Sequence, residues 1–118
     1  MAKILSIQLK PNIADKNVNI KKVEYFIEKY SDKNPDLVVL PEFFSTGIDH
    51  NSFINNPEDE NGGKTIQKIG EIAKKFNTNI VAGTVIEKAS DSKLYNTTFV
   101  VNRLGEVVAK YRKIHLFD

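Results

Sequence analysis

The segment Leu37-Val38-Val39-Leu40-Pro41-Glu42 constrains the fold more than any other part of the sequence. Its four consecutive branched aliphatic residues predict a short strand that is covered on both faces, as in the parallel sheet of an α/β protein. Proline has no amide proton to contribute to a sheet ladder, so the strand should end at Pro41. Ligands of open α/β sheets bind beyond the carboxyl ends of the strands, and Glu42 follows such an end directly.

Glu42 has two interpretations. If its side chain points into a crevice at the edge of the sheet, it is the leading candidate for a residue that takes part in chemistry. If a helix begins here instead, the carboxylate only stabilises the positive end of that helix. The segment by itself favours neither interpretation.

Periodicity in the rest of the chain predicts the element order β-α-β-loop-α-β-β-β. Residues 3–9 alternate like a strand, and Asp15 is a candidate N-cap for the amphipathic helix that follows. The polar segment 45–63 is a functional loop, a partly helical excursion or a disordered stretch. The buried stripe of the first helix should consist of Ile20, Val23, Ile27 and Tyr30.

The second half of the chain predicts one more helix and three more strands. Residues 65–76 repeat the helical spacing, and the segment Asn77-Thr78-Asn79 is placed to end this helix in the left-handed conformation. Gly83 interrupts the next strand and indicates a bulge or a close approach of another backbone segment. Gly105 takes the positive-φ position of a hairpin loop. The three strands should cover 80–86, 94–101 and 106–111.

The composition excludes several classes of protein. A chain of 118 residues, 41% hydrophobic and 27% charged, suits one globular domain. The formal net charge is only +2, with lysines scattered among acids, so we expect no nucleic-acid partner. No apolar run reaches about 18 residues, so no membrane segment is expected. The N-terminus has no secretion signal, and we expect a cytoplasmic protein.

The sequence also lacks the patterns of cofactor and metal sites. No glycine-rich loop follows a strand and opens a helix, so a phosphate or dinucleotide site is not supported. His50 and His115 are far apart and have no neighbouring ligand pattern. The absence of cysteine excludes a thiolate metal site, and also a cysteine nucleophile, within this chain. We therefore expect neither a cofactor nor a metal.

Basic residues gather at the end of the last predicted strand, in Lys110-Tyr111-Arg112-Lys113. A lone basic cluster is usually solvated surface. Lys113, however, follows an apolar strand in the same way as Glu42. If both side chains enter one crevice, they form a carboxylate and ammonium pair whose charges are partly desolvated.

Several short motifs occur in a defined order along the chain. The most specific are Pro41-Glu42 and Tyr111-Arg112-Lys113. In this order and spacing, the chain resembles the N-terminal part of the nitrilase superfamily, the carbon-nitrogen hydrolases, over its entire length. The weaker matching pieces are Ile7-Gln8, Asp15 with Asn19, Pro35-Asp36, Gly83-Thr84, Tyr95-Asn96-Thr97, Gly105 and Ile114-His115-Leu116.

The resemblance implies a fold and a catalytic set. The family fold is a four-layer α-β-β-α sandwich, of which residues 1–118 correspond to an N-terminal part. Glu42 matches the general base of the family and Lys113 its catalytic lysine, whereas the nucleophilic cysteine belongs to a C-terminal part that would begin after Asp118. Complete members of the family cleave a non-peptide C–N bond through a thioester, without a metal or organic cofactor.

The resemblance also suggests a substrate class and a partner. Residues 43–47 and 113–118 look more like ω-amidase-type or N-carbamoyl-amine hydrolases, which act on small aliphatic amides, than like true nitrilases. The chain alone should be inactive, because it has no cysteine. A second copy in a homo-oligomer, or a C-terminal complement, should cover its sheet.

Two alternatives belong to other functional classes. The chain could be a non-catalytic remnant of the same fold that associates with itself or with a partner through the exposed sheet. A small flavodoxin-like binding domain is more distant, since the phosphate loop is missing and the chain ends on a hairpin.

Overall fold

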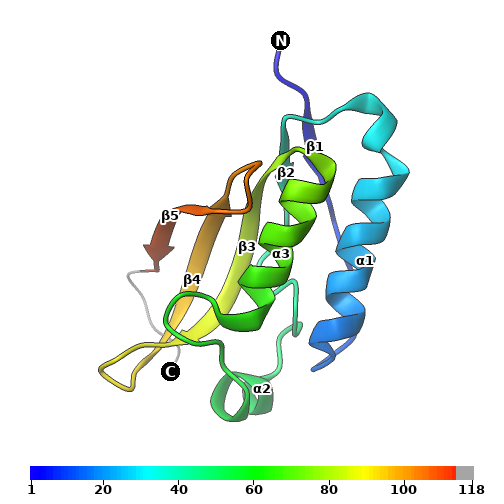
Figure 1. Cartoon of the computed structure of the whole chain (residues 1–118). Coiled ribbons are helices and arrows are strands. Elements are labelled where there is room, and N and C mark those ends of the chain that lie inside the picture. Colours follow the sequence, from blue (N-terminus) through cyan, green and yellow to red (C-terminus); the bar gives the residue numbers. More distant parts are fainter. Residues whose placement is uncertain (114–118) are drawn as a thin grey trace.

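The chain forms a five-stranded sheet with its two long helices packed on one face (Figure 1). The structure is a computed structural model that describes residues 1–113. The predicted element order is confirmed, and the segment 45–63 is a partly helical excursion because it contains α2. The elements are β1 (Ile4–Ser6), α1 (Lys16–Lys29), the 3-10 helix η1 (Ser31–Lys33), β2 (Leu37–Val39), α2 (His50–Asn55), α3 (Gly63–Phe76), β3 (Asn79–Lys88), β4 (Leu94–Val101) and β5 (Val107–Arg112).

The strands lie in the sheet in their chain order, β1-β2-β3-β4-β5. β1, β2 and β3 are parallel, whereas β4 is antiparallel to β3 and β5 is antiparallel to β4. β5 therefore runs in the same direction as β2, and both strands end at the same edge of the sheet. The two antiparallel pairs do not fit the parallel sheet of a flavodoxin-like domain.

The first long helix begins, and the second ends, where the sequence predicts. The Asp15 carboxylate accepts a hydrogen bond from the backbone N of Val18 at 3.2 Å and caps α1. Asn77 ends α3 in the left-handed conformation, with φ of 52°. The placement of Tyr30 on the buried stripe is wrong, because α1 ends before it and its side chain is 37% exposed. None of the helices within residues 1–113 is long and apolar enough to cross a membrane.

The two faces of the sheet are covered to different degrees. On the face that packs against α1 and α3, which we call the helix face, Val38 and Ile80 are fully buried in one core. On the opposite face, the open face, Ile4 is 64% exposed. The prediction that the central strand is covered on both faces is therefore wrong, since Leu37 and Val39 are only half-buried. The physical reason is that both long helices lie on the same face (Figure 1).

Gly83 allows the segment after β2 to pass directly against β3. The pairing of β3 with β4 shifts register between Ala82 and Val85, and φ of Gly83 is +33°. A Cβ atom at this position would overlap the carbonyl oxygen of Pro41 and lie 2.7 Å from its carbonyl carbon. Gly83 thus combines the bulge and the close backbone approach that the sequence indicates.

We predict that Gly83→Ala destabilises the fold by about 2–4 kcal/mol, because it adds backbone strain at positive φ to a clash with Pro41. Urea unfolding of the 118-residue chain measures the change. Ala109→Ser, on an exposed position of β5, is the control and should stay within about 0.5 kcal/mol of the parent. Equal midpoints for Gly83→Ala and the parent would contradict the close approach.

Candidate active site

Glu42 and Lys113 form an ion pair at the edge where β2 and β5 end. The ammonium of Lys113 donates to Oε1 of Glu42, and Nδ2 of Asn96 donates to the same oxygen at 3.0 Å. The structure therefore brings together the two side chains that the sequence singles out, 71 positions apart. It adds Asn96 as a third member. The chemical roles of the pair stay a prediction.

Glu42 reaches this position because the chain crosses the sheet after β2. β2 and β5 are three places apart in the sheet, which corresponds to roughly 14 Å at the usual spacing of strands. The carbonyl group of Pro41 packs on Gly83 of β3, and the backbone N of Phe43 donates to Oγ1 of Thr84 at 3.1 Å. The backbone on each side of Glu42 is thus held over β3, from where its side chain extends to β4 and β5.

The turn after Glu42 is strained and held by packing. Phe43 adopts φ of +53°, a left-handed conformation that costs a non-glycine residue about 1–2 kcal/mol. Its ring lies 5.0 Å from that of Phe53 in α2, and both are buried with Ile86. α2 begins only at His50, so Glu42 is not in the first turn of a helix. The interpretation of Glu42 as a helix-dipole partner is therefore wrong.

Lys113 is directed to the open face by the alternation of side chains in the last hairpin. Arg112 is opposite Thr97 in the β4–β5 register, and the backbone N of Lys113 donates to the carbonyl oxygen of Asn96 at 2.9 Å. Successive residues of a strand point to opposite faces. Thr97 faces the buried Glu87 on the helix face, so Asn96 and Lys113 share the open face.

Asn96 contacts both members of the pair, and the sequence analysis did not assign it this role. Its side chain binds Glu42, its main chain binds Lys113, and only 3% of its surface is exposed. Asparagine is depleted in strands, so its place inside a strand next to two threonines was a usable signal. The short motif Tyr95-Asn96-Thr97 pointed to the position but not to the contact.

The ion pair keeps Glu42 ionised. The hydrogen bond from Lys113 lowers the pKa of Glu42, partial burial opposes it, and the hydrogen bond from Asn96 adds to the lowering. The carboxylate is thus in the form that can accept a proton. Glu42 and Lys113 keep 45% and 47% of their side-chain surface exposed, so the desolvation expected for the pair is only partial in residues 1–113.

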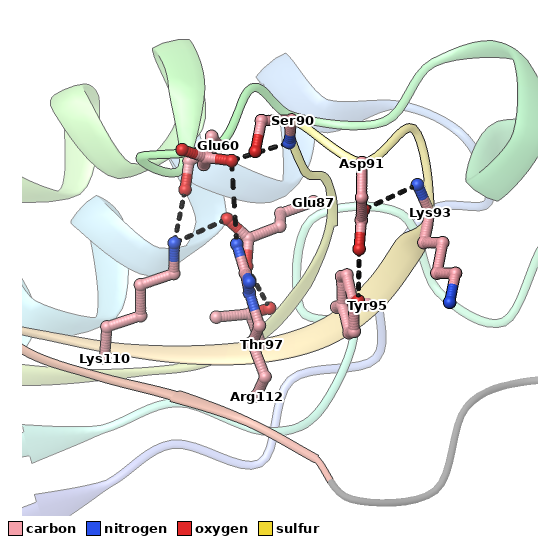
Figure 2. A network of polar contacts seen from close by, with 9 residues as sticks. All are labelled: Glu60, Glu87, Ser90, Asp91, Lys93, Tyr95, Thr97, Lys110 and Arg112. Carbon is pink, nitrogen blue, oxygen red and sulfur yellow. Dashed lines mark hydrogen bonds and ion pairs between the residues drawn. The ribbon is translucent and has the colours of Figure 1, made fainter.

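Two other glutamates are buried and bind cations. Glu58 pairs with Lys16 at 2.5 Å and accepts from Oγ1 of Thr65 at 2.6 Å near the start of α3. Glu87 binds Lys110 and Arg112 (Figure 2). These two residues of the basic cluster are therefore not simply solvated surface. Neither buried glutamate was predicted from the sequence, because periodicity does not distinguish a buried carboxylate from an exposed one.

The described part of the chain contains no group of three or more His, Cys, Asp or Glu side chains that could hold a metal ion. His50 lies on α2, with its ring 5.5 Å from that of Phe53. His115 and the remainder of the Ile114-His115-Leu116 motif lie outside the described residues, as do Phe117 and Asp118.

Comparisons with known proteins agree on one family. The protein-family model described as carbon-nitrogen hydrolase matches residues 3–118 of this chain. The chain is 43% identical over 101 residues to the 2-oxoglutaramate amidase of Bacillus subtilis (strain 168), covering 85% of this chain and 38% of that protein. It is 34% identical over 124 residues to omega-amidase NIT3 of Saccharomyces cerevisiae, covering 98% of this chain and 42% of that protein.

A solved structure extends the similarity to the fold. The crystal structure of Saccharomyces cerevisiae Nit3, a member of branch 10 of the nitrilase superfamily, superposes with a TM-score of 0.87 at 29% identity. The superposition covers 97% of this chain and 44% of that one. The chain therefore spans less than half of the length of these relatives.

We predict that Lys113→Ala raises the pKa of Glu42, because the hydrogen bond from Lys113 is the largest influence that lowers it. Asn96→Ala should raise the same pKa by less. The pH titration of the Glu42 carboxyl ¹³C shift measures both changes. Because the pKa of Glu42 is lowered in the folded state, the ion pair stabilises the fold at pH values above the usual pKa of a glutamate side chain. This contribution disappears as the pH falls through the lowered pKa.

Lys33→Ala is the control for this titration, because it removes a lysine from η1, before the opposite end of β2. It should leave the Glu42 curve unchanged. Identical curves for Lys113→Ala and the parent would show that the two side chains do not meet in solution.

Proposed function

The chain belongs to the carbon-nitrogen hydrolase family, and from this premise we propose that it supplies the general base and the lysine of a site that hydrolyses small amides. Glu42 is the base and Lys113 the catalytic lysine. The observation that carries the proposal is their ion pair on the open face, with Asn96 bound to the same carboxylate oxygen. Residues 1–118 then represent a partial domain, since this sequence has no cysteine.

The proposed reaction begins at a cysteine contributed from outside these residues. A thiol with a pKa near about 8.5 is mostly protonated at neutral pH, so it needs a base. Glu42 takes the thiol proton while sulfur bonds to the amide carbonyl carbon. The C=O electron pair moves to oxygen, and the ammonium of Lys113 stabilises the resulting oxyanion. The tetrahedral intermediate then re-forms the carbonyl and breaks the C–N bond.

The second half of the reaction releases the products and restores the site. The departing nitrogen takes the proton from Glu42 and leaves as ammonia or an amine, which gives a thioester. Glu42 next removes a proton from water, whose oxygen attacks the thioester carbonyl. The C–S bond breaks, the carboxylic acid leaves, and the cysteine sulfur recovers its proton. Glu42 acts as base and acid in turn, which requires it to be ionised at the start, as its lowered pKa favours.

The substrate class is proposed from the relatives. Two of them are named for amides, a 2-oxoglutaramate amidase and an omega-amidase. We place the substrate of this site among the ω-amides of small aliphatic acids, with N-carbamoyl amines as the neighbouring class. The elements that favour this choice are residues 43–47, which follow Glu42, and the segment that starts at Lys113.

The open face indicates where the remainder of the site would come from. Ile4 and Tyr111 are 64% and 57% exposed there, and Leu37, Val39, Val81 and Val100 are half-buried. This apolar surface lies on the same face of the sheet as the Glu42–Lys113 pair. We propose that a C-terminal part like that of the longer relatives, carrying the cysteine, packs on the open face and shelters the pair. A homo-oligomer through this face is the alternative for a non-catalytic chain.

Complementation tests the proposal. The 118-residue chain is joined to the remaining C-terminal part of the Bacillus subtilis 2-oxoglutaramate amidase, and ammonia release from 2-oxoglutaramate is measured. We expect no turnover by the chain alone and turnover by the chimera. Glu42→Gln and Lys113→Ala should each lower kcat/KM by about 10²–10⁴, because each removes a group that acts in the transition state.

Glu106→Gln, on the hairpin before β5, is the matched control and should retain activity. Circular dichroism and gel filtration establish whether the chimera folds. If it does not, the same two substitutions are made at the aligned positions of the complete amidase, where unchanged kcat/KM would overturn the assigned roles. Full turnover by the 118-residue chain alone would overturn the need for a cysteine from outside.

A further inference from the structure

Glu87 is a buried carboxylate that binds both cations of β5 on the helix face (Figure 2). Its side chain is 0% exposed, and its Oε1 accepts from Nε of Arg112 and from Oγ1 of Thr97, each at 2.7 Å. The ammonium of Lys110 lies 2.8 Å from Oε2. We call Glu87, Thr97, Lys110 and Arg112 the Glu87 cluster. It joins β3, β4 and β5 at one end of the sheet.

Removal of any member of the cluster is expected to destabilise the fold. Burial raises the pKa of Glu87, but the hydrogen bonds from Arg112, Lys110 and Thr97 outweigh it and lower the pKa. Breaking a buried pair leaves a charge without a partner, which is far more costly than the pair is stabilising. A residue outside the cluster adds a contact: the backbone oxygen of Glu60 accepts a hydrogen bond from the ammonium of Lys110 at 2.6 Å.

Arg112 is fixed on two further sides. Its guanidinium carbon lies 4.6 Å from the centre of the Tyr95 ring, and it approaches the Glu60 carboxylate at 3.9 Å. Figure 2 shows the guanidinium between Glu60 and Glu87, with the Tyr95 ring beside it. The side chain of Arg112 is therefore held by several contacts at the carboxyl end of β5.

The remainder of β5 has little other support in the described part of the chain. Its residues from Val107 to Tyr111 are all exposed, and the strand pairs with β4 on one side. A strand held by one ladder and no buried apolar side chains frays at its end. Lys110 and Arg112 are thus its side-chain anchors.

Arg112 of the Glu87 cluster and Lys113 of the candidate active site are adjacent in the sequence and point to opposite faces of the sheet. Arg112 points to the helix face and Lys113, the next residue, to the open face. The main chain of Lys113 is bound to Asn96, and its side chain to Glu42. Loss of the anchor would free the end of β5 and, with it, the direction of Lys113.

We propose that Glu87 is a positioning residue: by binding Arg112 and Lys110 on the helix face, it fixes the end of β5 and so delivers Lys113 to Glu42 on the open face. Its importance for catalysis rests on the proposed function, whereas the positioning itself does not. Glu87 touches neither Glu42 nor Lys113 among the described contacts and acts through the strand.

The sign of a pKa change tests the proposal on the 118-residue chain. Removing the charge of Glu87 by itself takes a negative charge away, which would lower the pKa of Glu42. Losing the placement of Lys113 raises that pKa instead, since Lys113 is its main lowering influence. We expect Glu87→Ala to raise the pKa of Glu42 in the carboxyl ¹³C titration. A lowered or unchanged pKa would overturn the proposal.

Amide hydrogen exchange separates positioning from general destabilisation. In Glu87→Ala, the amide of Lys113 should lose about tenfold more protection than the amide of Ile80 in the core of β3. Equal losses would mean that Glu87 only stabilises the fold, and would overturn the proposal. Glu60→Gln is the matched control, because it removes a carboxylate of the same network but leaves the ion pairs of Glu87 in place, and it should not raise the Glu42 pKa.

A conservative variant covers the case in which Glu87→Ala does not fold. Glu87→Gln keeps the side-chain volume and an acceptor for Arg112 but loses the ion pairs. It should raise the Glu42 pKa by less than the alanine variant does, with the same sign. Neither experiment measures turnover, so a chimera that folds but is inactive would overturn the proposed function and leave the positioning result standing.

Discussion

The distance between β2 and β5 is the constraint on which the candidate site depends. Glu42 and Lys113 follow strands that two other strands separate, so straight strand ends would leave them roughly 14 Å apart. The chain closes this gap by crossing β3 after Pro41, which is feasible because Gly83 has no side chain and the adjacent Thr84 accepts from the backbone of Phe43. The bulge in β3 is thus a part of the site as much as of the fold.

The open end of the β4–β5 hairpin makes contacts on both faces of the sheet. On the open face Asn96 binds Glu42 through its side chain and Lys113 through its main chain. On the helix face Thr97 and Arg112, one residue along each strand, bind the buried Glu87. Because alternation couples the faces, a fixed residue on one side sets the direction of its neighbour on the other.

The sequence predicted what periodicity and steric rules control. Asp15, Asn77, Gly83 and Gly105 each have a local backbone reason to be where they are, and the structure confirms all four. Contacts between distant strands were harder to predict, because Asn96 and Glu87 give no periodic signal. Coverage of the central strand was predicted wrongly for a similar reason. An apolar run says that a strand can be covered on two faces, but not whether the covering element is within the same 118 residues.

The account assigns one half of a hydrolase site to this chain and the sulfur to a part that packs on the open face. Its central claim is geometric, and a crystal structure of the 118-residue chain at neutral pH tests it most directly. The account predicts that the Glu42 carboxylate accepts from both the Lys113 ammonium and the Asn96 amide on the open face. A Lys113 side chain on the helix face, or a Glu42 side chain that does not cross β3, would contradict it.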